Sequence, residues 1–422
     1  MADFKRTSFN TVPFNAGPFD TASCDKRPWL TVLGWTEGGT TALTPASRTA
    51  LDTAELVFGA RRHLRLLPRL EAEVREWPVP FADGIPQLLA ERGRRVVMLV
   101  SGDPFWFGAG TSVTRHLSPG EWQALPSPSS FSLAASRLGW PLERCVCLGL
   151  HAWPLTRIRP HLHQGGRLLV LLRDGDAAIE LAALLEQFGF GKSHLHLLES
   201  LGGDNERLRT VLAGDELPED IQHPVAVAVE VAGAGPALPL TSGLADEWFE
   251  HDGQITRQSV RAVTMAALAP TPGERLWDIG TGSGSVAIEW LLAHPDNRAL
   301  AFERHAERAT RARRNASQLG VDWLEVVEGP VPDVLADQSP PDAVFIGGGL
   351  SAALLETLWR QLPEGVRLVA NAVTLESEAL LGEWQQRVGG ELVRLELATV
   401  APIGTRRGWK SAWPIVQWRV LR

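Results

Sequence analysis

The fold of this chain is decided by the stretch RLWDIGTGSGSVAIEW, Arg275–Trp290. A short apolar strand leads into a glycine loop, and apolar residues at helical spacing follow the loop. Glycines let the backbone turn tightly and approach a ligand, and the helix N-terminus beyond presents unpaired N–H groups. Ser285 stands where a dinucleotide-binding fingerprint has its third glycine. The spacing G-x-G-x-G therefore indicates the amino-acid part of S-adenosylmethionine (SAM) rather than a pyrophosphate.

Glu303 stands at the end of the next predicted strand, RALAFE (298–303). A carboxylate at that position can accept hydrogen bonds from both ribose hydroxyls of an adenosine. A surface glutamate at a strand end is the alternative interpretation, and the preceding glycine loop makes it the weaker one. We therefore predict a cofactor site in this half of the chain, formed by Thr256, Asp278, Gly280, Gly282, Gly284, Glu303 and Gly329.

Strand and helix signals alternate around the glycine loop, which predicts a doubly wound, mostly parallel sheet. LVRLELATV (392–400) and PIVQWRVL (414–421) follow each other without a helix. We expect them to pair as an antiparallel hairpin, connected by residues 401–413. A helix is predicted over 304–319, with Gly320 at its C-cap. Its arginines are expected to form a solvated face: Arg304, Arg308, Arg311, Arg313 and Arg314.

The length of 422 residues favours two domains, because a single core seldom grows beyond about 250–300 residues. Strand and helix signals also alternate in the first half, which is expected to be α/β with its own core. Residues 231–243 are rich in Gly, Pro and Ala, as linkers are. We expect a flexible leader at 1–28, a first domain at 29–236 and a second domain at 237–422.

Composition disfavours several classes of partner. A net charge of −8 argues against a nucleic-acid surface, which needs clustered basic residues. The chain has no Tyr and no N-P-P-Y motif, so amino methylation of a nucleic-acid base is not expected. No apolar stretch reaches the roughly 18 residues of a membrane helix, so no membrane partner is predicted.

Cysteine and histidine pairs give only weak metal signals. Cys145-Val-Cys147 could be half of a zinc site, but the chain has no second pair to complete it, and RCVCLGL alternates like a buried strand. Two His-x-His pairs, at 161–163 and 194–196, are interpreted as surface residues. We therefore predict no metal, and three cysteines in a chain of this size indicate the reducing cytoplasm.

Several further motifs resemble known families. HDGQITRQSVRA (251–262), PDAVFIGGG and NAVTLES accompany the glycine loop, and together they resemble the decarboxylating precorrin methyltransferases of cobalamin biosynthesis. LTVLGWTEGGTTALT (30–44), GARRHL (59–64), VSGDPFWFGAG (100–110), PSPSSFSLAASRLG and LGLHA resemble the tetrapyrrole methylase family. From about Trp29 to the C-terminus, the fusion is similar to the precorrin-6Y C(5,15)-methyltransferases (decarboxylating).

The resemblance implies a two-lobed tetrapyrrole methylase domain followed by a Rossmann-like class I SAM methyltransferase with a seven-stranded sheet. The first domain would methylate carbon 5 of a precorrin, and the second would methylate carbon 15 and decarboxylate the ring C acetate. It further implies one SAM per domain and a homo-oligomer, for which a tetramer is one assembly. A metal-free macrocycle is favoured, and the cobalt-containing one of the anaerobic pathway is the alternative.

The first domain departs from its family pattern at two places. The loop that usually reads G-x-G-P-G is Gly34-Trp-Thr-Glu-Gly38 here, and P-G-[IV]-S-S becomes Pro126-Ser-Pro-Ser-Ser130. The element Ser101-Gly-Asp-Pro104 is kept. The resemblance assigns cofactor contacts in this half to Gly34, Gly102, Asp103, Ser129 and Ser130.

A methyl transfer from a sulfonium needs alignment, exclusion of water and control of one proton. Candidate catalytic residues are Asp103, His151, Arg257 and Asn371, although Asp103 could equally be a turn residue before Pro104. A polyanionic substrate favours arginine, whose planar fork binds both oxygens of a carboxylate. Candidate substrate residues are Arg61, Arg62 and His63 in the first half, and Arg261, Arg406, Arg407 and Lys410 in the second.

Two other functions stay open at this point. A SAM methyltransferase of an RNA or protein acceptor would keep the second domain as described, and the negative net charge disfavours RNA. Alternatively, the altered Gly34–Gly38 loop could leave the first domain as a non-catalytic module for substrate delivery or assembly.

Overall fold

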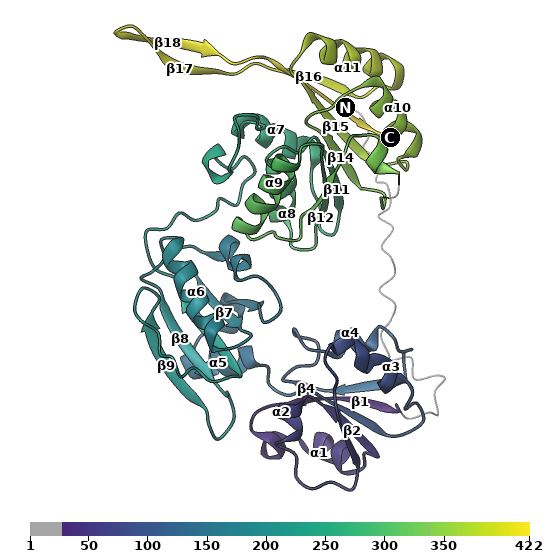
Figure 1. Ribbon diagram of the computed structural model, residues 1–422, viewed down its shortest axis with the longest axis vertical. Helices are drawn as coiled ribbons and strands as arrows, with labels where there is room; N and C mark the ends of the chain where they lie inside the picture. The colour runs from purple at the N-terminus through teal and green to yellow at the C-terminus, as the bar shows by residue number, and fades with distance from the viewer. Residues whose placement is uncertain (1–27, 337) are drawn as a thin grey trace, which may run out of the picture. The chain divides into compact units, whose positions relative to one another are not determined.

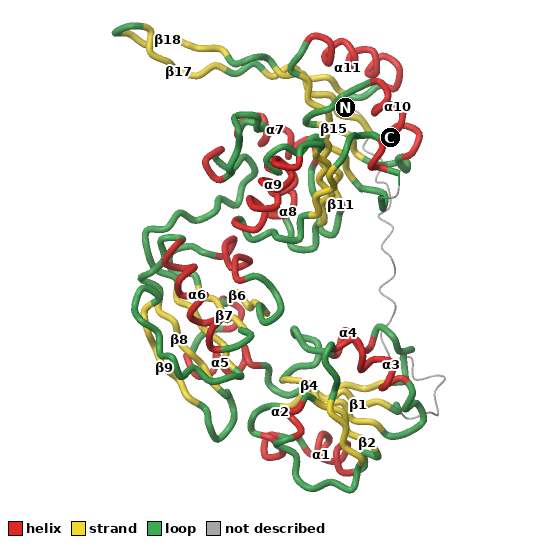
Figure 2. The backbone as a smooth tube through the Cα atoms, in the orientation of Figure 1, coloured by secondary structure: helices red, strands yellow, loops and turns green. Residues whose placement is uncertain are grey.

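The chain folds into two α/β units in the computed structural model, which describes residues 28–336 and 338–422 (Figures 1 and 2). The first unit contains the described chain up to Ala152 and Gly165–Gly233. The second contains Ala234–Arg422 and also Trp153–Gln164, which falls inside the first predicted domain. The leader expected at 1–28 lies outside the described residues, apart from Pro28. None of the described helices is long and apolar enough to cross a membrane.

The first sheet of the N-terminal unit is parallel, with strand order β3-β2-β4-β1-β5. Strand β1 is buried at every residue, as parallel strands covered on both faces are. The carboxyl ends of its strands meet at one edge, where open α/β sheets bind ligands. The elements are β1 (Leu30–Trp35), α1 (Pro45–Asp52), β2 (Leu56–Gly59), α2 (Arg61–Leu64), β3 (Glu73–Glu76), α3 (Gly84–Leu89), β4 (Val96–Ser101), α4 (Gly110–Thr114) and β5 (Trp122–Leu125).

The second sheet of this unit is mixed, with strand order β6-β7-β10-β8-β9. Only β6 and β7 pair in parallel, and the other three pairings are antiparallel. The elements are α5 (Ser130–Leu138), β6 (Val146–Gly149), β7 (Arg167–Leu171), α6 (Gly175–Gln187), β8 (His194–Glu199), β9 (Arg207–Leu212) and β10 (Val225–Glu230). Two sheets in one unit confirm the expected two-lobed α/β domain.

The C-terminal unit is built on one seven-stranded sheet with the order β13-β12-β11-β14-β15-β19-β16. The first five strands are parallel, and β19 pairs antiparallel with β15 and β16. This confirms the doubly wound sheet with a terminal antiparallel pair. The elements are α7 (Gln258–Leu268), β11 (Arg275–Ile279), α8 (Ser285–Ala293), β12 (Arg298–Glu303), α9 (Ala306–Gln318), β13 (Glu325–Glu328), β14 (Ala343–Ile346), α10 (Ala352–Gln361), β15 (Arg367–Ala372), α11 (Leu375–Val388), β16 (Glu391–Leu395) and β19 (Ile415–Leu421).

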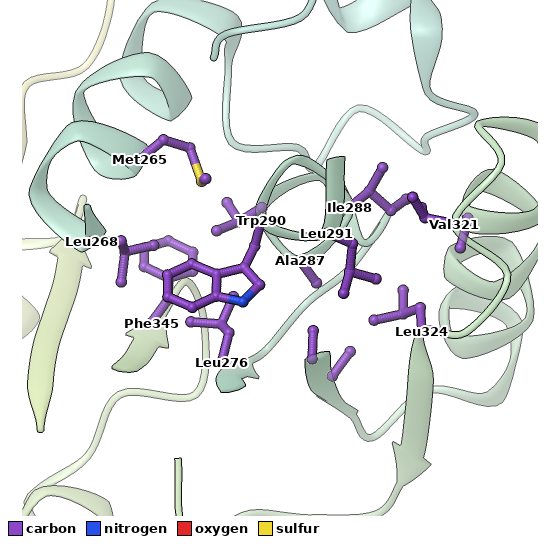
Figure 3. Close-up of a cluster of buried hydrophobic side chains, with 14 of the residues drawn as sticks. Met265, Leu268, Leu276, Ala287, Ile288, Trp290, Leu291, Val321, Leu324 and Phe345 are labelled. Carbon is purple, nitrogen blue, oxygen red and sulfur yellow. The ribbon is translucent and has the colours of Figure 1, made fainter. Parts of the chain in front are cut away.

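Apolar side chains cover both faces of this sheet. Helices α7 and α8 pack on one face, where Trp290 lies among Met265, Leu268, Leu276 and Phe345 (Figure 3). Helices α10 and α11 supply leucines and Trp384 to the other face. The two cores hold the glycine loop between β11 and α8 at the carboxyl edge of the sheet.

The connection between the last two sheet strands differs from the expectation. Residues 398–411 form two further strands, β17 (Ala398–Ile403) and β18 (Arg406–Ser411), which pair with each other in a separate two-stranded sheet. The predicted strand 392–400 is therefore split between β16 and β17. Figure 1 shows this ribbon extending away from β16 and the seven-stranded sheet. Alternation of side chains predicts strands, but it does not show which strand pairs with which.

The segment Trp153–Gln164 is fixed within the C-terminal unit by charged and aromatic contacts. Arg157 donates from Nε and Nη2 to the carboxylate of Asp322, at 2.6 and 3.0 Å. Its guanidinium also lies over the rings of Trp153 and Trp323, at 4.1 and 5.1 Å. A side chain at Gly320 would meet Pro160 Cδ at 2.7 Å, so this contact requires a glycine.

Candidate active sites

The glycine loop of the C-terminal unit has positive φ at Gly280, Gly282 and Gly284, a region that favours glycine. A Cβ on Gly280 would lie 2.6 Å from the carbonyl oxygen of Gly348, so this glycine lets the loop pass close to the loop after β14. A Cβ on Gly282 would meet only Gln254 O, at 3.5 Å. The loop is therefore tight on its protein side and open at Gly282, where a ligand can approach.

Asp278 is buried at the end of β11. Its Oδ2 accepts from Thr281 Oγ1 at 2.6 Å and from Ala287 N at 3.1 Å, while Oδ1 has no hydrogen-bond partner within the described residues. Burial raises the pKa of Asp278 to about 6, against the opposing effect of the hydrogen bond from Thr281. An unpaired, buried carboxylate oxygen fits a cationic ammonium such as the α-amino group of SAM.

Glu303 is also buried, at the end of β12. Its Oε2 accepts from Gly282 N and its Oε1 from His305 N, both at 3.0 Å. Each carboxylate oxygen has a further lone pair, so the group can still accept from ribose hydroxyls. Gly329 lies beside it, because Gly329 N donates to Glu303 O at 3.0 Å.

The solvated face expected for the helix over 304–319 is confirmed at Arg304, Arg313 and Arg314, which are exposed, but Arg308 and Arg311 are partly covered. Arg308 donates to Asp252 Oδ2 at 2.9 Å and to Gln254 Oε1 at 2.8 Å, and Arg311 pairs with Asp252 at 3.2 Å. Arg314 pairs with Glu250 at 3.1 Å. These contacts hold residues 250–254 against α9 next to the glycine loop. Periodicity placed the arginines on one face, but it did not reveal that an acidic segment covers part of that face.

Arg261, predicted to bind substrate, is buried completely instead. Its Nε donates to Glu289 Oε1 at 2.6 Å, and its two terminal nitrogens donate to Asp246 and to the carbonyls of Thr256 and Leu244. All of its N–H groups are engaged with protein. The structure therefore contradicts the substrate role and makes Arg261 the centre of a buried ion pair.

Arg257 and Asn371 lie on neighbouring elements. Arg257 is exposed at the N-cap of α7, with Nη1 3.2 Å from Asp246 Oδ2, and Thr256 precedes it. Asn371, near the carboxyl end of β15, donates to Thr264 Oγ1 at 3.0 Å and accepts from Gln417 Nε2 at 2.9 Å. Both residues remain candidates for a catalytic role at the carboxyl edge of the sheet.

Three predicted substrate cations lie elsewhere. Arg406, Arg407 and Lys410 are exposed on β18, whose strand partner is β17 alone. The ribbon extends away from the sheet that carries the glycine loop (Figure 1). The structure therefore does not bring these cations to the glycine-loop site of their own unit.

The N-terminal unit contains a cavity of about 630 Å³. Its walls come from the ends of β1 and β4 in the first sheet and of β7, β8 and β10 in the second. The predicted residues among its lining are Arg62, His63, Gly102, Asp103, Ser129, Ser130 and His151. Lining residues that sequence patterns did not single out include Glu37, Arg173 and His223.

Close backbone contacts define one wall of the cavity. A Cβ on Gly34 would lie 2.2 Å from Gly102 O and 2.4 Å from Ser127 N, so a side chain is excluded there. Gly102 itself has φ +57 and packs against Ser129. Ser129 caps α5 by accepting from Ser132 N at 3.0 Å. The changes in the two family loops therefore leave the close backbone contact of Gly34 with Gly102 and Ser127 in place. Gly34 is not in the cavity lining, and it supports the lining through this contact.

A chain of polar contacts crosses the cavity wall at the carboxyl ends of β1, β2 and β4. Arg62 Nη1 donates to Glu37 Oε1 at 2.7 Å, and its Nη2 donates to Ser101 Oγ. Ser101 Oγ lies 3.3 Å from His63 Nε2. Burial, reinforced by the charge of Arg62, lowers the pKa of His63 to about 3, so this ring is neutral at physiological pH. Arg61 is exposed and lies outside the lining.

The two catalytic candidates of this half differ in their surroundings. Asp103 Oδ1 accepts from Phe105 N at 2.8 Å, which is the turn contact of the alternative interpretation. His151 is exposed at the cavity, and partial desolvation lowers its pKa below the usual value. Among the described residues, no group of three His, Cys, Asp or Glu side chains is arranged to hold a metal.

Comparison with known proteins gives a family for each half. Residues 30–215 match the model of the tetrapyrrole (corrin/porphyrin) methylases, and residues 247–422 match that of the precorrin methyltransferase domain. A precorrin-6Y C(5,15)-methyltransferase [decarboxylating] of Sinorhizobium sp is 47% identical over 396 residues, which cover 93% of this chain and 96% of that protein.

Two further relatives match one part of the chain. A cobalt-precorrin-6B C(15)-methyltransferase (decarboxylating) of Salmonella typhimurium is 27% identical over 177 residues, covering 40% of this chain and 91% of that protein. The crystal structure of the C-terminal domain of precorrin-6Y C5,15-methyltransferase from Rhodobacter capsulatus is 47% identical, with a TM-score of 0.43, and covers 44% of this chain and all of that one. The near full-length similarity and the two family matches show that the chain belongs to the precorrin-6Y C(5,15)-methyltransferases (decarboxylating), SAM-dependent enzymes of cobalamin biosynthesis.

Proposed function

We propose that the two methylations are divided between the two units. The N-terminal cavity serves carbon 5, and the glycine-loop site serves carbon 15 and the decarboxylation of the ring C acetate. The observation that carries this division is the length of the Salmonella relative. Its name gives C(15) methylation with decarboxylation, and its match covers only 40% of this chain. A protein about as long as the C-terminal unit is therefore sufficient for the methylation of carbon 15 and the decarboxylation.

In the C-terminal unit, bound SAM supplies an electrophilic methyl group on a sulfonium. Asp278 Oδ1 would hold the ammonium of its amino-acid part, and Glu303 would accept from its ribose hydroxyls. Residues 250–254, fixed by Arg308 and Arg311, lie beside the glycine loop at Gly282. Arg257 is the exposed cation that can meet a carboxylate of the macrocycle, and Asn371 can hold a polar group at the edge of β15.

In the N-terminal unit, the crossing of Gly102 and the Ser129–Ser130 turn would hold a second SAM. Arg62, oriented by Glu37 and Ser101, binds a substrate carboxylate. His151 is the candidate for moving the proton, because its lowered pKa leaves the ring neutral and able to accept.

Two variants of the full chain test this division. Glu303→Ala removes the ribose acceptor, and Gly34→Ala disrupts the crossing behind the cavity. Each is incubated with precorrin-6Y and SAM, and the products are analysed by mass spectrometry and by carbon dioxide release. We expect Glu303→Ala to give a product with one added methyl and its acetate retained. Gly34→Ala should lose only the methylation of carbon 5. Loss of both methylations in either folded variant contradicts the division.

The names of the relatives also bear on the metal content of the substrate. We propose a metal-free precorrin as substrate, because the relative that matches nearly the whole chain is named for precorrin-6Y, whereas the shorter one is named for cobalt-precorrin. Turnover of the cobalt-containing macrocycle at an equal rate would contradict this. The free thiols of Cys145 and Cys147 support a cytoplasmic location.

Self-association through the ribbon is proposed from its exposed apolar side chains. Ile403 and Trp409 of the ribbon expose 65% and 75% of their surface, and Trp413 just after it exposes 83%, which is unfavourable in water. A second copy covering the ribbon would bury them. Light scattering of the full chain should report an oligomer, and Trp409→Ser with Trp413→Ser should dissociate it. A monomeric full chain would contradict the proposal.

A further inference from the structure

The loop after β4 presents two aromatic side chains to the N-terminal cavity. Trp106 and Phe107 line the cavity and expose 38% and 51% of their surface. Large apolar side chains exposed together mark a surface that another molecule covers. Both belong to the SGDPFWFGAG motif, of which the chemistry described above uses only the first residues.

Both rings are held in place from behind. Their centroids lie 5.2 Å (Trp106) and 5.7 Å (Phe107) from that of Phe131, which is buried in the first turn of α5. Gly149, at the end of β6, leaves room for the second ring, because a Cβ there would lie 2.6 Å from Phe107 Cδ1. Both rings therefore rest on Phe131, and Phe107 also packs closely against the end of β6.

The backbone of this loop is strained at Phe107. Phe107 has φ +55, the left-handed region that non-glycine residues seldom adopt and that costs about 1–2 kcal/mol. Gly108 and Gly110 pack so closely on Pro104 that an added Cβ would lie 2.5 Å from its carbonyl oxygen. Strain that keeps an aromatic ring exposed in a cavity points to a ligand contact.

The same cavity supplies polar partners that match one class of ligand. Arg62, Arg173, His151 and His223 line it together with the two rings. A precorrin has a broad, largely apolar face and a rim of acetates and propionates. SAM carries a single carboxylate beside its ammonium and sulfonium charges, so two arginines match the several carboxylates of a precorrin better.

We infer that Trp106 and Phe107 form an aromatic platform on which one face of the precorrin macrocycle packs, while Arg62 holds a carboxylate of the rim. The inference rests on the proposed assignment of carbon 5 to this unit. It makes the two residues determinants of substrate affinity that do not contribute to cofactor binding.

The test compares neighbouring residues of the same loop. Trp106→Ala and Phe107→Ala should each raise the KM for precorrin-6Y in carbon 5 methylation at least tenfold, since each removes apolar contact area worth more than 1.4 kcal/mol. Phe105→Ala is the matched control. Phe105 is 45% exposed, but its ring packs on Trp122 at 5.6 Å and it lies outside the cavity lining. This control should change KM less than twofold.

Three readouts separate the platform from other roles. The KM for SAM should stay within twofold in all variants, and Trp106→Phe should restore most of the precorrin affinity. An increased KM for SAM with an unchanged KM for precorrin-6Y would show a cofactor platform and overturn the inference, as would no change in either. If the proposed assignment fails, Glu303→Ala loses the methylation of carbon 5. If only the platform fails, Glu303→Ala still methylates carbon 5.

Discussion

The two sites of this chain are constructed in opposite ways. The C-terminal site is a tight cradle within one stretch, Asp278–Glu303, whose two acids are buried and whose glycines have positive φ. The N-terminal site is a cavity of about 630 Å³ with walls from residues between Trp35 and Ala226. The C-terminal site therefore depends on backbone shape and buried charge, whereas the N-terminal site depends on side chains supplied by distant segments.

The strongest test of this contrast concerns Arg261, whose role changed from substrate contact to buried ion pair. Arg261→Ala leaves Glu289 buried without its partner, so we expect the C-terminal unit to lose about 3–5 kcal/mol of unfolding free energy. Arg257→Ala, an exposed neighbour on α7, should change it by about 0.5 kcal/mol or less. Denaturant titration measures both. A stable Arg261→Ala protein with weakened substrate binding would restore the original interpretation.

The next largest effect concerns the cofactor in the cradle. Glu303→Ala removes acceptors for two hydroxyls, at roughly 1.5 kcal/mol each, so SAM should bind this site about 100-fold more weakly. Glu328 is the matched control, because it lies opposite Glu303 in the register of β12 and β13 but is exposed and paired with Arg313. Calorimetry of Glu328→Ala should show normal affinity. Equal losses of SAM affinity in both variants would mean that Glu303 only stabilises the ends of the two strands and does not bind the ribose.

The buried acid of the cradle should make its affinity depend on pH. Burial raises the pKa of Asp278 to about 6, so the carboxyl is neutral below that value and charged above it. A cationic ligand group prefers the charged form, and SAM should therefore bind about tenfold more weakly at pH 5 than at pH 7. Asp278→Asn should bind weakly at both values without this dependence. If SAM affinity changed with pH in the same way in Asp278→Asn, the titrating group would be another residue.

The smallest expected effect lies in the cavity. Glu37→Gln weakens the ion pair that orients Arg62, and such partly exposed pairs contribute about 0.2–1 kcal/mol. The KM for precorrin-6Y should rise about two- to fivefold, with kcat unchanged. Glu230→Gln weakens a longer ion pair, with Arg167 at 3.6 Å, outside the cavity and should have no effect on KM. A large fall in kcat for Glu37→Gln would instead place Glu37 in the proton transfer.

The C-terminal site could be predicted from the sequence more fully than the N-terminal cavity. The cradle is local, so one strand, one loop and one acid were enough to predict Asp278, Gly282 and Glu303 as neighbours. The cavity brings Glu37, Arg173 and His223 together from segments far apart, and no spacing links them. Short strands such as β3, exposed at three of its four residues, also lack the apolar alternation that predicts a strand.

Arg261 and the arginines of α9 show the other limit. Residue type indicates that a cation seeks an anion, but it does not tell whether that anion belongs to a substrate or to the protein. Glu289 and Asp252 are 28 and 56 residues away from the arginines they bind. Only the folded arrangement separates a structural pair from a binding residue.

The segment Trp153–Gln164 has a consequence for dissecting the protein. The chain crosses between its two units at 152–153, 164–165 and 233–234, so no single cut yields both units whole. A C-terminal fragment that begins near residue 234 lacks Arg157, the partner of Asp322, and leaves the Trp323 ring uncovered. A division of the gene near residue 234 therefore separates the C-terminal unit from the twelve-residue segment that packs on Gly320 and Asp322.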